Sequence, residues 1–143
     1  MPSIMIGELS VTYRLGHDPV GIGRARELAR KTLATWGLSE HAGLAEIIIT
    51  ELATNALHHG TGPIDIGLSY FGSDLWAEVH DNGTGRPVRR QATADDEQGR
   101  GLELLDGLID LYRGARGVVD DSGGPGKTVY VAVSLVKDLT SAD

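Results

Sequence analysis

The sequence predicts an α+β fold, a two-layer sandwich in which helices cover one face of a mixed, mainly antiparallel sheet. Segments with strand-like alternation and segments with helical spacing follow one another as strand, two helices, two strands, loop, helix and two strands. Short turns join strands that are consecutive in the chain, which favours antiparallel pairing over the long crossovers of a parallel sheet. Residues 1–143 are expected to form a single domain.

The first half of the chain predicts one strand and two helices. Residues 8–15 (ELSVTYRL) alternate as a strand does. A helix is then expected to begin at Gly21 and Gly23 and to end at Gly37, with basic residues on its polar face. That basic face, residues 24–31, is either solvated or a surface for a partner or a second copy.

The second helix is expected over residues 40–59, with Ser39 as its N-cap and Gly60 as its stop. Its core stripe should comprise Leu44, Ile47, Ile48, Leu52 and Ala56.

The second half predicts a hairpin, a long loop, a helix and two more strands. Residues 63–71 and 75–80 read as strands, and Gly72-Ser73-Asp74 between them is typical of a hairpin turn. The remaining expected elements are a loop over 81–98, a helix over 99–108, strands over 111–119 and 128–136 around a Gly/Asp-rich turn, and a frayed tail over 137–143.

Composition excludes several classes of protein. The 143 residues include no cysteine, which removes disulfide frameworks, thiolate zinc sites and cysteine nucleophiles. The formal net charge of −7 argues against nucleic-acid binding. No apolar stretch is long enough to span a membrane and the start lacks a secretion signal, so a cytoplasmic protein without membrane contact is expected. Of the 20 glycines, 14 lie from Gly60 onward.

Three polar side chains share one side of the second predicted helix. Glu51, Asn55 and His59 each follow the last by four residues, which places them nearly in line at the border of the apolar stripe. They either form a functional row or satisfy backbone groups and solvent, and the helix alone does not decide between these readings.

Two glycine-rich segments are candidate ligand contacts. In the segment DNGTG, Asp81 follows a strand and can accept a hydrogen bond from an amino group. Gly83 and Gly85 let the backbone approach a ring. The alternative interpretation is a simple Asp-x-Gly turn. The amides of Gly99, Arg100, Gly101 and Leu102, which open the third helix, can cradle phosphate, or the glycines can merely permit a tight turn.

Other nucleotide and catalytic patterns are excluded. The segment GKT at residues 126–128 is not a phosphate-binding P-loop, because Asp121 replaces the required glycine and a strand follows in place of a helix. Neither a zinc-binding spacing nor a Gly-x-Ser-x-Gly elbow is present.

Taken in order, ELATNALHHG, DNGTG, GRGLELL and GKTVYV resemble the N, G1 and G2 boxes and the trailing strand of the GHKL (Bergerat-fold) ATPases. Nearly the whole chain is covered, and its length and two-helix opening are similar to the stand-alone anti-sigma-factor serine/threonine kinases. The resemblance implies that ATP and Mg²⁺ are the cofactors. It also implies that Asn55 holds Mg²⁺ and that Glu51 is the base that takes the proton from a serine hydroxyl or from water.

The resemblance further implies how the nucleotide is held. Asp81 would accept from the adenine amino group with Thr128 helping through a water molecule, and Gly83 and Gly85 would pass close to the base. Gly99, Arg100, Gly101 and Leu102 would cap the phosphates, with Arg86 at the start of an ATP lid over residues 86–98. His59 matches the end of the N box without a defined role.

The function that this resemblance implies is phosphorylation of a STAS-type anti-anti-sigma protein together with sequestration of a sigma factor, by a homodimer. One departure concerns catalysis, because Glu97 and Gln98 stand where these kinases place an arginine before the G2 glycines. The alternative is a nucleotide-gated module that holds a partner without phosphorylating it. A degenerate domain that serves only as a scaffold is a third hypothesis.

Overall fold

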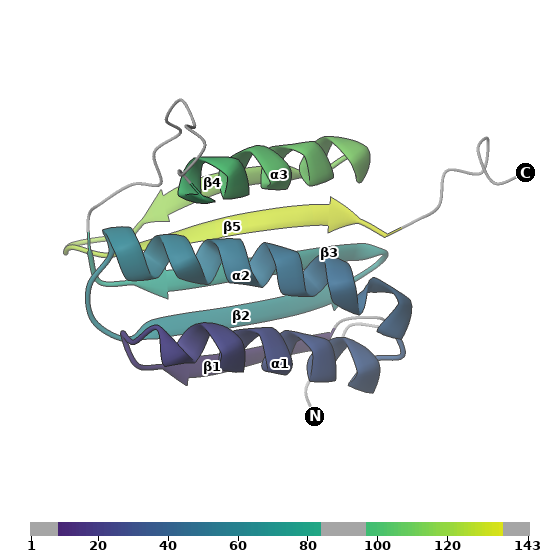
Figure 1. The fold of residues 1–143 in the computed structure, drawn as a ribbon, viewed down its shortest axis with the longest axis horizontal. Helices are drawn as coiled ribbons and strands as arrows, with labels where there is room; N and C mark the ends of the chain where they lie inside the picture. Colours follow the sequence, from purple (N-terminus) through teal and green to yellow (C-terminus); the bar gives the residue numbers. More distant parts are fainter. Residues whose placement is uncertain (1–8, 84–96, 136–143) are drawn as a thin grey trace, which may run out of the picture.

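The computed structural model describes residues 9–83 and 97–135, which form a five-stranded sheet with helices on one face (Figure 1). The elements are β1 (Leu9–Leu15), α1 (Val20–Thr35), a 3₁₀ turn η1 (Ser39–His41), α2 (Ala42–His59), β2 (Ile64–Phe71), β3 (Asp74–Asp81), α3 (Glu97–Leu111), β4 (Ala115–Asp120) and β5 (Lys127–Ser134).

The strand order is β1-β2-β3-β5-β4, and every pairing is antiparallel. The predicted α+β sandwich is confirmed, and the parallel component that a mixed sheet would contain does not occur among the described strands. The β2–β3 hairpin turns at Gly72, whose φ of 64° is in the left-handed region, as the glycine-containing turn predicted. β5 returns to the middle of the sheet beside β3 and leaves β4 at the edge.

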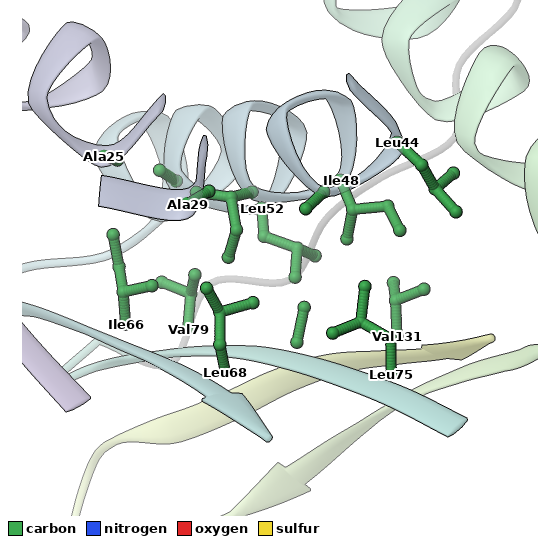
Figure 2. Close-up of a cluster of buried hydrophobic side chains, with 14 of the residues drawn as sticks. Ala25, Ala29, Leu44, Ile48, Leu52, Ile66, Leu68, Leu75, Val79 and Val131 are labelled. Atoms are coloured by element: carbon green, nitrogen blue, oxygen red, sulfur yellow. The ribbon is translucent and has the colours of Figure 1, made fainter. Parts of the chain in front are cut away.

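The core lies between the helices and the sheet (Figure 2). Ile48 and Leu52 of α2 face Leu68 and Val79 from the strands, and small residues of α1 such as Ala29 let the two helices pack closely. One residue of the predicted stripe does not belong to this core: Ile47 is 36% exposed on the outer surface of α2. Its position directly before Ile48 turns it away from the sheet, since successive helical residues are about 100° apart.

The end of α1 follows the prediction, and the start of α2 does not. Gly37 has a φ of 76°, and the Leu38 amide donates to the Leu33 carbonyl over 2.7 Å, so α1 closes in a Schellman motif. Ser39, by contrast, does not cap α2. It opens the 3₁₀ turn, and α2 begins at Ala42 with no side-chain cap, because the tight turn supplies the backbone bonds that a cap would have made.

The prediction of a strand over 111–119 is wrong at its start. Leu111 ends α3, and the chain reverses through Arg113 at a φ of 54° before β4 begins at Ala115. Gly114 comes one residue after the left-handed position, where a Cβ would overlap the carbonyl of Ala132. Gly114 therefore allows the backbone to pass close to β5, and Arg113 adopts the left-handed conformation, which is strained for a residue with a side chain.

Candidate functional site

The three polar residues predicted to share a side of α2 lie on its second half, and His59 is its last residue. Asn55 is buried, with 4% of its surface exposed, and Glu51 is half-buried one turn earlier. An amide oxygen and a carboxylate one turn apart are hard oxygen donors of the type that Mg²⁺ takes. The arrangement therefore suits the expected metal role of Asn55.

Glu51 also borders a groove of about 410 Å³ on the outer side of the helices. Its lining comes from all three helices: Arg26, Gly43, Glu46, Ile47, Thr50, Glu51 and Leu104. Burial raises the pKa of the Glu51 carboxyl, because partial removal from water disfavours the charged form. The Glu51 carboxylate lies beside the groove, and its raised pKa makes it a stronger base than an ordinary glutamate.

Asp81, at the end of β3, is fully buried and bound to a lysine. Its cross-strand neighbour in the sheet is Lys127, the first residue of β5. The Lys127 Nζ atom lies 3.0 Å from Oδ1 and 2.9 Å from Oδ2 of Asp81, and the two residues are 1% and 0% exposed. The Gly83 amide donates a further bond to Oδ1 over 2.7 Å.

Lys127, the partner of Asp81, was missed in the sequence analysis, which named Thr128, the next residue of β5. Thr128 pairs with His80 in the register, and the alternation of β5 turns its side chain to the other face of the sheet from Asp81. The sequence did contain a signal for Lys127. Alternate residues of a strand face the same side, and Lys127 alternates with Val129, Val131 and Val133, all of which face the core.

Gly83 has a structural reason in addition to its predicted role. A Cβ on Gly83 would lie 2.9 Å from the Gly60 Cα, and a Cβ on Gly60 would overlap the Asp81 carboxyl group. The Asn82 amide also donates to the Thr61 carbonyl over 2.9 Å. These contacts fix the end of β3 against the turn that follows α2.

A histidine ties the same turn to the start of α1. His17 Nε2 lies 2.9 Å from the Leu57 carbonyl, and Nδ1 lies 3.1 Å from the Gly62 carbonyl. A neutral imidazole donates to one such acceptor and an imidazolium to both. The contact links the last turn of α2, which ends at His59, to the connection between β1 and α1.

The predicted phosphate contacts lie partly outside the described residues. α3 begins at Glu97, two residues before the predicted start, so of the four predicted residues only Gly99 has its amide in the first turn, where a helix N-terminus attracts anions. Arg100, Gly101 and Leu102 lie beyond that turn, where amides donate to carbonyls of the helix itself. Gly85, Arg86 and most of the expected lid fall within residues 84–96, outside the described part.

Within residues 9–83 and 97–135, no group of three His, Asp or Glu side chains is arranged to hold a metal by itself. None of the helices in that part of the chain has both the length and the apolar character needed to cross a bilayer.

Comparisons with known proteins point to one family. The sequence model described as "Histidine kinase-like ATPase domain" matches residues 17–132, which includes Glu51, Asp81 and Lys127. No curated protein sequence matches the chain.

Solved structures of histidine kinases share the fold. The histidine kinase domain of the blue-light activated kinase EL346 from Erythrobacter litoralis superposes with a TM-score of 0.52 at 18% identity, over 81% of this chain and 60% of that one. Histidine kinase AdeS of Acinetobacter baumannii gives a TM-score of 0.51 at 15% identity, over 89% and 68%. The chain therefore spans about three fifths of the Erythrobacter structure, and at these identities the likeness concerns the fold alone.

Proposed function

This chain belongs to the histidine kinase-like ATPase domain family, and from that premise we propose that it binds ATP with Mg²⁺ and phosphorylates a serine or threonine of a STAS-type anti-anti-sigma protein. The observation that carries the proposal is the half-buried Glu51 carboxylate, one turn from the buried Asn55 amide and open to a groove. This placement suits a base that meets a hydroxyl from a second protein.

The residues divide the work of phosphoryl transfer. Bound Mg-ATP supplies the γ-phosphoryl group and the cation that offsets its charge. Asn55 would hold the cation through its amide oxygen, and the amides of the first turn of α3 would bind the phosphates. Glu51 accepts the proton of the acceptor hydroxyl group. The hydroxyl oxygen then bonds to the γ-phosphorus, while the bond between that phosphorus and the ADP oxygen breaks.

We further propose that a sigma factor is the second partner and that the chain acts as a homodimer in the cytoplasm. The exposed face of α1 supports a protein partner, because Arg24, Arg26 and Arg30 border a surface hollow of about 540 Å³ with Glu27 as its one acidic residue. A basic patch on a chain of net charge −7 favours an acidic surface on the partner.

The experiment is a transfer assay with radiolabelled ATP, Mg²⁺ and candidate STAS proteins. Label should reach a serine or threonine of one candidate. E51Q should retain ATP binding and lose transfer by at least about a hundredfold, the usual contribution of a general base. Undiminished transfer by E51Q would remove Glu51 from the reaction.

A nucleotide-gated module without kinase activity is the second candidate. The sequence around Glu97 favours it, because the anti-sigma-factor kinases place an arginine in this stretch and a negative residue lacks the charge that attracts a phosphate. ATP retention without transfer to any STAS protein, combined with ATP-dependent capture of a partner, would select this function.

A further inference from the structure

The buried pair of Asp81 and Lys127 conflicts with the adenine contact expected of Asp81 from the sequence. Recognition of adenine by Asp81 requires a carboxylate oxygen that can accept from the exocyclic amino group. Both oxygens already accept from Lys127 Nζ, at 3.0 and 2.9 Å, and the carboxylate has no surface open to solvent.

We propose that Lys127 competes with the amino group of adenine for Asp81 and thereby sets the affinity and base selectivity of this chain for ATP. The inference rests on the proposed nucleotide site. It assigns to Lys127 a specificity-determining role in that site.

The hydrogen-bond chemistry supports competition. An ammonium and an adenine amino group are both N–H donors, so they seek the same carboxylate oxygens. The ammonium adds the attraction between two opposite charges, which a neutral amino group does not have. Lys127 and the Gly83 amide together take three of the about four acceptor positions of the carboxylate, so a base that reaches Asp81 competes with them for what remains.

The packing around Asp81 leaves few alternative approaches. The Gly83 amide occupies a further position on Oδ1, and Gly60 lies so close to the carboxyl group that a Cβ there would overlap it. Both charges of the pair are almost fully buried, so a displaced ammonium also loses its counter-ion. Adenine binding to the wild type is therefore opposed by the pair, whereas phosphate binding is not.

The test compares ATP with inosine triphosphate, which carries the same phosphates and an oxo group in place of the amino group. Calorimetric titration with Mg²⁺ gives both dissociation constants. Wild type should prefer ATP by less than about threefold, and K127M should bind ATP about tenfold more tightly and prefer it to inosine triphosphate about tenfold, the effect of one hydrogen bond to a charged group.

Two further variants keep the test decisive. K127Q retains an N–H donor for Asp81 but no charge, so it should fold even where K127M does not, with an ATP affinity above that of the wild type. Lys31, exposed on α1, provides the matched control, and K31M should bind both nucleotides as the wild type does.

Equal or weaker ATP binding by both Lys127 variants would overturn the inference, because Lys127 would then support the nucleotide or leave it unaffected. Absence of ATP binding in the wild type and in both variants would likewise overturn it. Tighter binding by the Lys127 variants without transfer to any STAS protein would uphold the inference and reject the kinase function.

Discussion

Lys127 and Asp81 are both charged and both almost fully buried, so each depends on the other for the free energy of its ionised form. Removal of one member of such a pair leaves a charge away from water with no partner, which costs about 3–5 kcal/mol. Replacement of both by neutral groups of similar size costs far less. The net contribution of the pair to stability is therefore small.

A double-mutant cycle measures this dependence. D81N and K127M should each lower the free energy of unfolding by about 3–5 kcal/mol, and the double variant should recover most of the loss. Urea denaturation followed by circular dichroism gives the four values. Additive losses would mean that the two side chains are not coupled in the folded protein.

Glu51 should reduce stability at neutral pH because burial raises its pKa. Its ionised form is penalised in the folded state, so stability falls as pH rises above the ordinary glutamate value of about 4.3 and levels off above the raised folded value. E51Q should therefore melt at a higher temperature than the wild type at pH 7, and the difference should vanish below pH ~4.

Thermal melts at several pH values check this expectation. The exposed Glu103 on α3 provides the control, and E103Q should leave the melting temperature nearly unchanged. A melting temperature for E51Q below that of the wild type at pH 7 would mean that Glu51 makes stabilising contacts that outweigh its desolvation.

At the scale of the element, one glycine in α1 and one just beyond it have opposite effects. Gly37 follows the end of the helix at a φ of 76°, where a side chain is strained, and Gly23 lies in the first turn of the helix with open space around it. G37A should lower the free energy of unfolding by about 1–2 kcal/mol. G23A should raise it by up to about 1 kcal/mol, because alanine favours helix over glycine.

Chemical denaturation of these two variants, each beside the wild type, provides the measurement. Because both changes are glycine to alanine and add the same methyl group, the comparison isolates backbone conformation. Similar shifts in the same direction would contradict the assignment of Gly37 as the helix stop.

Elements with strong periodicity and a clear stop could be predicted from the sequence. α2 and the β2–β3 hairpin follow their apolar patterns and glycine turns almost to the residue. The boundary between α3 and β4 could not be predicted from the sequence. A helix end is usually marked by a glycine in the left-handed conformation, but here Arg113 has that conformation and the glycine is the next residue, Gly114. Gly114 is needed for passage over Ala132, a contact made in the folded sheet alone.

The candidate site shows the same division. Local spacing predicted the row of Glu51, Asn55 and His59, since one helix carries all three. The partner of Asp81 depends on the register between two strands, and Lys127 follows Asp81 by 46 residues in the chain, so local spacing could not predict it. The family resemblance named Thr128, the next residue.

At the scale of the whole molecule, one core cluster joins the helices and the sheet. It contains buried residues from α1, α2, α3 and the strands, and Trp36 packs against it. On the other face of the sheet, Trp76 stacks on Tyr130 with ring centroids 4.5 Å apart. The two tryptophans thus report on opposite sides of the molecule.

A shared core predicts a single cooperative unfolding transition. Tryptophan fluorescence and far-ultraviolet circular dichroism should give the same urea midpoint, and W76F, which leaves Trp36 as the one reporter, should again give coincident curves. Separated midpoints in either protein would mean that the helical layer and the sheet unfold independently, contrary to the single domain expected from the sequence.

The antiparallel register of β5 has an evolutionary consequence. A slip of one residue would bring Thr128 to Asp81, but it would also expel Val129, Val131 and Val133 from the core. A one-residue insertion or deletion that shifts β5 therefore cannot change the neighbour of Asp81 without disrupting the core. A descendant of this chain can alter that neighbour by mutating one codon, at position 127, while the register of β5 and its three core valines stay in place.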